Sequence, residues 1–137
     1  MTTTAKPSDV KTLGLTWELF RSQVESDADF DAYIQEVLDA NREDVIFEIG
    51  ETLYADATKK TDVVNIEKYL ANAELLRRRA IIIKGQSVPD GPTGKEEMDM
   101  AGVQEERAKR TIARLIGSDD TLSVSVEESN HFGQPEE

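Results

Sequence analysis

Hydrophobic positions recur every three or four residues along three long stretches of the chain, which is the period of an amphipathic α-helix. In residues 61–85 the apolar stripe comprises Val63, Ile66, Leu70, Ala73, Leu76, Ala80 and Ile83. Thr61 or Asp62 could cap the start of this helix, and Gly85 is expected to form a left-handed cap at its end. Further apolar residues lie outside the stripe, namely Tyr69, Leu75, Ile81 and Ile82. A helix that is apolar on more than one face needs more than one neighbour, so this stretch predicts the inner helix of a small bundle.

A second long helix is predicted to begin with Asp27 as its cap and to continue to Leu53. Its apolar face consists of Phe30, Tyr33, Ile34, Val37, Leu38, Val45, Ile49 and Leu53. The connection that follows, residues 55–61, is short and polar, which favours an antiparallel pair of helices. Phe47 lies outside the apolar face. Like Ile81 and Ile82, it is predicted to make apolar contacts between subunits.

The remaining helical signals are shorter or thinner. Thr16 is expected to cap a short helix over residues 17–24, in which Trp17 anchors the segment on the bundle rather than stacking on a ligand. Residues 86–94 contain two prolines and two glycines and predict a loop. A third long helix then runs to Ile116 with a weaker stripe, formed by Met98, Ala101, Glu105, Ala108, Ile112 and Leu115.

The last twenty residues, 118–137, lack helical periodicity. Leu122, Val124 and Val126 alternate with serines, a pattern typical of a single strand. Because a lone strand cannot satisfy its own backbone hydrogen bonds, these three residues are predicted to pair with a partner.

The sequence therefore predicts an all-α fold: a small bundle of two long antiparallel helices, a short N-terminal helix and a third long helix. An extended C-terminal tail with one short strand follows the bundle. The expected organisation is an N-terminal arm at 1–15, a helical bundle domain at 16–117 and the tail at 118–137.

Composition narrows the possible functions. The chain has 137 residues and no cysteine, so it fits one domain and has neither a disulfide scaffold nor a thiolate zinc site. It shows no signal-peptide pattern and no apolar run long enough for a membrane span, so production in the cytoplasm is expected. The formal net charge is −12, which opposes binding to nucleic-acid phosphates. This acidity suits either a surface that resists aggregation or adaptation to high salt.

The one dense cationic cluster is formed by Arg77, Arg78 and Arg79. Three consecutive helical residues spread over most of a turn, so they cannot all face one partner. They are predicted to pair with Glu74 and with acidic neighbours across a bundle or subunit contact. Contact with DNA phosphates is the alternative, which the net charge opposes.

Known catalytic and cofactor patterns are not matched. The segment Gly91–Glu96 is similar to the end of a phosphate-binding loop, but it lacks the earlier glycine, the hydroxyl residue after Lys95 and a preceding strand. His131 is the only histidine, which excludes a multi-histidine metal site within one chain. We expect no cofactor, no metal site and no enzymatic activity.

The order of these features resembles the head–tail connector (adaptor) proteins of tailed bacterial and archaeal viruses. The resemblance covers residues 17–117. It rests on Asp29-Phe30-Asp31, on Gly50 with Tyr54, on Ala73-Glu74-Leu75 followed by the three arginines, and on a tail from Ser118. It implies a structural virion protein that forms a dodecameric ring beneath the portal and continues the DNA channel. It also implies docking of neck or tail proteins, and termini that reach into neighbouring subunits or the portal.

We therefore expect a homo-oligomeric subunit at the head–tail interface of a virion, with DNA passing through without specific binding and with no membrane contact. One alternative is a helical binding or chaperone-like module with a groove for a peptide. Another is an enzyme whose site is assembled from carboxylates between chains.

Overall fold

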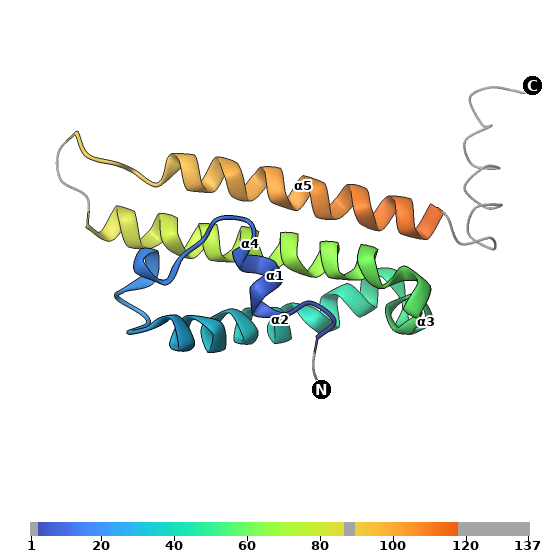
Figure 1. The fold of residues 1–137 in the computed structure, drawn as a ribbon. Helices are drawn as coiled ribbons and strands as arrows, with labels where there is room; N and C mark the ends of the chain where they lie inside the picture. Colours follow the sequence, from blue (N-terminus) through green and yellow to red (C-terminus); the bar gives the residue numbers. More distant parts are fainter. Residues whose placement is uncertain (1–2, 87–89, 118–137) are drawn as a thin grey trace, which may run out of the picture.

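The structure, a computed structural model, describes residues 3–86 and 90–117, and this part of the chain is helical with no strand. The prediction of an all-α fold is confirmed for these residues. Three long helices dominate, α2 (Asp27–Ile49), α4 (Lys60–Gly85) and α5 (Lys95–Gly117). Figure 1 shows α4 between α2 and α5, with the chain running in one direction along α2 and α5 and returning along α4. Four short elements complete the fold, namely α1 (Pro7–Lys11), η1 (Trp17–Phe20), α3 (Glu51–Ala55) and η2 (Ala57–Lys59).

Helix α2 is capped and ended by residues on either side of it. The side chain of Ser26 accepts a hydrogen bond from the backbone N–H of Asp29, at 3.2 Å, so Ser26 is the N-cap and Asp27 is the first helical residue. The predicted continuous helix to Leu53 is wrong. Gly50 has a φ of +86°, a conformation that glycine adopts without steric cost, and it separates α2 from α3. Leu53 is nevertheless buried.

Helix α4 differs from its prediction at both ends. It begins at Lys60, directly after η2, in which the Asp56 side chain accepts a bond from the backbone N–H of Thr58. Gly85 is its last helical residue and does not have a positive φ, so the predicted left-handed cap is wrong. The helix ends instead with the N–H of Gln86 bonding back to the carbonyls of Ile82 and Ile83, at 3.2 and 3.1 Å.

The buried apolar side chains form two clusters at the two ends of the bundle. The first core cluster joins the N-terminal segment and η1 to α2, α4 and the start of α5, and includes Val10, Phe20, Phe30, Ile34, Leu38, Leu75 and Ala101. The second core cluster comprises Val45, Ile49, Leu53, Val63, Ile66 and Leu115. Ala5, Val10 and Leu15 belong to the first cluster, so the segment predicted to be an N-terminal arm packs on the bundle. Trp17 is half-buried against the same cluster, in agreement with its predicted anchoring role.

Helices α4 and α5 meet along small side chains. Ala80 on α4 and Ala101 and Ala108 on α5 are all buried. Gly94, just before α5, lies close to Ala80 of α4. A Cβ atom at Gly94 would lie 2.7 Å from the Ala80 carbonyl oxygen. The predicted stripe of α5 is correct for Ala101, Ala108 and Leu115, whereas Met98 is half exposed. The two helices therefore pack with a short separation between their backbones.

Candidate interaction surface

Two large apolar side chains project into solvent from different helices. Phe47 on α2 is 88% exposed and Ile81 on α4 is 70% exposed. Both positions follow from the sequence pattern, because they lie outside the stripes that form the core. Ile82 differs from its two companions, since it is half-buried and packs against the first core cluster of its own chain.

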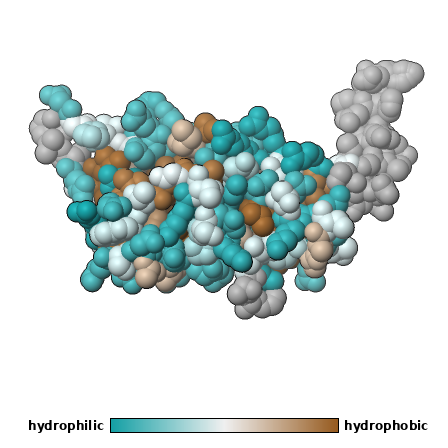
Figure 2. Space-filling model, viewed as in Figure 1, coloured by the Kyte–Doolittle hydropathy of each residue, from teal (hydrophilic) through white to brown (hydrophobic). Residues whose placement is uncertain are grey.

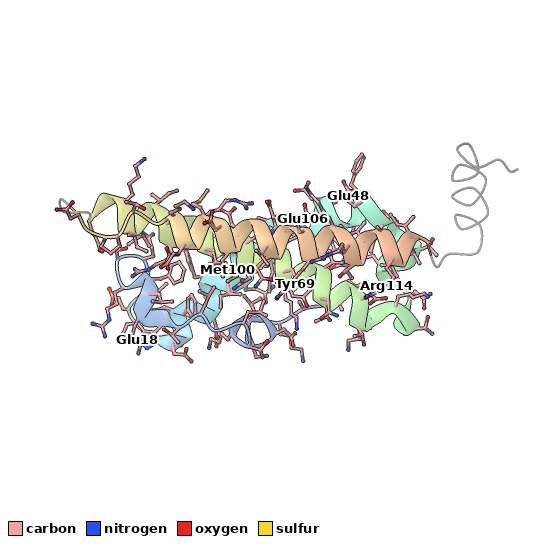
Figure 3. The ribbon with its side chains drawn as sticks, turned by 90° about the horizontal axis from the view of Figure 1, so that it is seen from above. Glu18, Glu48, Tyr69, Met100, Glu106 and Arg114 are labelled. Atoms are coloured by element: carbon pink, nitrogen blue, oxygen red, sulfur yellow. The ribbon has the colours of Figure 1, made fainter. Side chains whose placement is uncertain are left out.

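A groove of about 430 Å³ runs over α4 between α2 and α5. Its accessible apolar lining comes from Leu70 on α4 and Ile112 on α5, which are half-buried, whereas Val45 of α2 borders the groove but is fully buried. Asp44 and Glu48 line the α2 side, and neither carboxylate has an ion pair or side-chain hydrogen bond within the described residues. Figure 3 shows Glu48 and Glu106 on one side of the molecule and Glu18 on the opposite side. The groove therefore lies on the side away from the short N-terminal elements.

A second hollow, of about 300 Å³, lies farther along α4 and is lined by Gln23, Tyr33, Arg78, Ile81 and Ile82. Leu70, Arg77 and Ile81 are spaced seven and four residues apart, so they lie on one face of α4. This face of α4 connects the two hollows.

The side of the molecule that carries α1 is more uniformly polar than the side with the groove. In Figure 2, which shows the side with α1, hydrophobic residues form small separate patches within a largely hydrophilic surface. Met100 on α5 contributes an exposed apolar side chain there. The ring of Tyr69 is covered by the guanidinium of Arg107, at 6.0 Å from its centroid. The apolar area on this side is therefore discontinuous.

The three consecutive arginines of α4 point in different directions and bind within their own chain. Arg77 forms an ion pair with Glu105 of α5. Arg78 binds Glu74 at 3.0 Å, as the sequence predicted, and covers the Tyr33 ring at 5.3 Å. Arg79 donates to the Leu19 carbonyl oxygen at 2.8 Å. Together they connect α4 to α5, α2 and η1, and the predicted ion pairs between subunits stay a prediction.

Glu67 is a buried carboxylate that the sequence analysis missed. It is 1% exposed, and its oxygens accept hydrogen bonds from the Ala5 N–H, at 2.7 Å, and from the Tyr54 hydroxyl. Burial raises the pKa of Glu67, while these bonds and the nearby Arg42 charge oppose the rise. Burial and the bond to Glu67 also raise the pKa of Tyr54. Glu67 thereby holds the N-terminal segment against α4 and α3. Glu67 follows Ile66 and lies four residues after Val63, and both of these are buried. This spacing places Glu67 next to the buried stripe of α4, which was the sign in the sequence that it is buried.

The raised pKa of Glu67 makes folding stability depend on pH. Between the unfolded and the folded pKa of this carboxyl, the folded state binds more protons, so its contribution to stability is present at low pH and is lost as the pH rises. We expect Glu67→Gln to remove this loss, so that the free energy of unfolding of the wild type falls relative to the variant between pH 4 and pH 7. Urea denaturation of both proteins across this range measures the difference.

A surface substitution provides the control for the pH experiment. Glu48→Gln removes one exposed carboxylate and should keep the pH dependence of the wild type. If Glu67→Gln and Glu48→Gln show the same dependence, titration of Glu67 does not contribute to the pH dependence of stability.

Leu122, Val124 and Val126, predicted to form the tail strand, lie outside the described residues. Within residues 3–86 and 90–117 there is no group of three or more acidic, histidine or cysteine side chains that could hold a metal ion. No helix in these ranges is long and apolar enough to cross a membrane.

Comparison with known proteins gives no match: no family model, no curated protein and no solved structure is significantly similar to this chain.

Proposed function

We propose that the protein is a structural subunit of a virion, a head–tail connector that forms a ring between the portal and the neck or tail. It acts by binding neighbouring proteins rather than by catalysis. The observation that supports this most directly is the exposure of Phe47 and Ile81, which are the most exposed of the large hydrophobic side chains in the described residues. Aromatic side chains contribute strongly to subunit contacts, and burying one Phe stabilises by roughly 1.5–3 kcal/mol.

The net charge of the protein suits the wall of a channel through which DNA passes. The chain has a net charge of −12, which repels phosphates. Arg77, Arg78 and Arg79, its densest cationic cluster, all bind groups of their own chain. They are therefore not free to hold a passing duplex, and this favours a conduit without specific DNA binding.

The proposal includes finer points that rest on the family resemblance. These are a dodecameric ring, docking on the portal on one side and on neck or tail proteins on the other, and a C-terminal tail that reaches a neighbour. In this proposal Leu122, Val124 and Val126 form a strand that adds to a partner's sheet. The tail orders only where its partner supplies backbone hydrogen bonds.

The test is assembly of the full chain, alone and with the portal protein of the same virus. We expect rings in negative-stain images and discrete multiples of the protomer mass in mass photometry, at least in the mixture. Deleting residues 118–137 should leave a folded helical protein, because both core clusters lie before Gly117. This truncated form should no longer join the assembly.

Two outcomes would contradict the proposal. If the full chain forms no ring under either condition, the connector function is wrong. If the truncated form assembles as well as the full chain, the role of the tail is wrong.

A second candidate function is a helical module that binds a peptide. The groove between α2 and α5 supports it, because the half-buried Leu70 and Ile112 provide an apolar floor for an amphipathic helix. This function predicts a monomer or dimer that binds a helical peptide and forms no ring when the portal protein is added. Mass photometry of the same mixture separates the two candidates.

A further inference from the structure

The two outer helices of the bundle carry unlike charge. Helix α2 contains eight acidic residues and one basic residue, Arg42. Helix α5 is divided: residues 95–106 contain five acidic residues and one lysine, whereas residues 107–117 contain four basic residues and no acidic residue. Arg114 pairs with Asp62, Lys109 with Glu106, and Arg107 contacts Gln104, so Arg110 is the basic residue of this half without a partner in the described residues.

Each outer helix also has an exposed face directed away from α4. On α2 this face consists of Glu36, Ala40, Glu43 and Phe47, which are all exposed and follow one another at helical spacing. On α5 the corresponding face consists of Val103, Glu106, Arg110 and Ala113, which are also all exposed. Since α4 lies between α2 and α5, the two faces lie at opposite edges of the protomer (Figure 1).

We propose that the outer face of α2 in one copy binds the outer face of α5 in a second copy, an inference that rests on the proposed ring. Phe47 packs against the small side chain of Ala113, and Glu43 faces Arg110. Arg110 has no partner within the described residues, and Glu43 is paired only with its neighbour Arg42 at 3.3 Å. Because the two faces differ, each copy has one neighbour on each side, which is the head-to-tail arrangement that generates rings.

The direction of the helices sets the register of this contact. Since α2 and α5 run the same way in Figure 1, the acidic second half of α2 lies level with the basic second half of α5 in a neighbouring copy. The first halves of both helices are acidic and repel one another. The contact is therefore confined to one end of the protomer, and adjacent copies splay at the other end. Such a tilt favours a curved assembly over a straight row.

The chain contains no cysteine, so disulfide cross-linking can test the contact directly. The double variant Phe47→Cys with Ala113→Cys should form a ladder of dimers, trimers and larger species on oxidation, seen on a non-reducing gel. Mixing the two single variants should give one heterodimer band. As a matched control, Phe47→Cys with Glu18→Cys should give no ladder, because Glu18 belongs to η1 and lies outside the α5 face that meets Phe47 of the next copy.

Charge reversal tests the pairing of Glu43 with Arg110. In the cysteine pair background, Glu43→Lys or Arg110→Glu alone should slow cross-linking by about fivefold, and the combined swap should restore it. Glu18→Lys and Lys84→Glu make the same changes in net charge at other exposed positions, and should leave the rate unchanged.

The cross-linking results test the contact between α2 and α5, and the ring assay tests the connector function, so the two proposals can fail separately. A homodimer of Phe47→Cys alone would indicate a two-fold contact through α2 and overturn the proposal, as would a ladder that is insensitive to both reversals. If the full chain forms rings with the portal protein but the cysteine pair does not cross-link, this contact is wrong while the connector function stands. If neither rings nor cross-links form, both fail.

Discussion

Phe30→Ala should lower the free energy of unfolding by about 3–5 kcal/mol, the usual cost of removing a buried aromatic side chain from a core. Phe30 is fully buried, and its ring stacks on Phe20 with centroids 5.3 Å apart and on Tyr33 at 6.5 Å. The substitution leaves a cavity where the N-terminal segment, α2 and α4 meet. Because a domain is typically stable by only about 5–15 kcal/mol, this change removes a large part of the total. Urea denaturation followed by circular dichroism measures it.

The same substitution at the surface is the matched control. Phe47→Ala removes an identical side chain that is 88% exposed, and should change the free energy of unfolding by less than about 0.5 kcal/mol. If the two variants lose similar stability, the assignment of Phe30 to the core is wrong. In assembly experiments we expect Phe47→Ala to have the larger effect of the two variants, because Phe47 belongs to the proposed contact between copies.

Gly94→Ala should cost about 2–3 kcal/mol, although it adds only one methyl group. Gly94 has a φ of +86°, which L residues adopt at a cost of roughly 1–2 kcal/mol. The added Cβ would also lie 2.7 Å from the Ala80 carbonyl oxygen and 3.0 Å from the Ala80 Cα, and these backbone atoms move only if α4 and α5 separate. The measurement is the shift in thermal midpoint of the purified variant.

Gly102 provides the contrast within α5, the helix that Gly94 precedes. A Cβ at Gly102 meets nothing within 4 Å, and the residue lies inside α5. Gly102→Ala should therefore stabilise the protein, by up to about 1 kcal/mol, because alanine favours the helix. A loss at Gly102 equal to that at Gly94 would show that the contact with Ala80 and the positive φ do not explain the effect of Gly94→Ala.

The long helices were predictable because their hydrophobic period extends over many turns, and a burial pattern of that length has no other regular solution. Their ends were not, because they depend on single residues. Ser26 caps α2 in place of Asp27, since its hydroxyl reaches the N–H of Asp29. Gly50 ends α2 whereas Gly85 stays helical, although each glycine comes within two residues of an apolar residue of the stripe, Ile49 and Ile83. The residues around each glycine do not show which one ends its helix, because that depends on the path of the segment that follows the glycine.

The surface was predictable in part for the same reason. Phe47 and Ile81 lie off the core stripes and are exposed, and the three arginines fan out because consecutive helical residues are about 100° apart. Ile82 is half-buried because the first core cluster extends around α4 farther than one stripe. Glu67 could not be assigned as an anchor, because its partner Ala5 is 62 residues away and a backbone N–H leaves no trace in a sequence pattern.

The division of the core into two clusters affects how unfolding can be observed. Trp17 is the only tryptophan and packs against the first cluster, whereas the second cluster contains none. Intrinsic tryptophan fluorescence therefore reports on one end of the rod, while circular dichroism averages over all helices. If the two ends open independently, the two signals will give different midpoints, and a single free energy of unfolding will not describe the molecule.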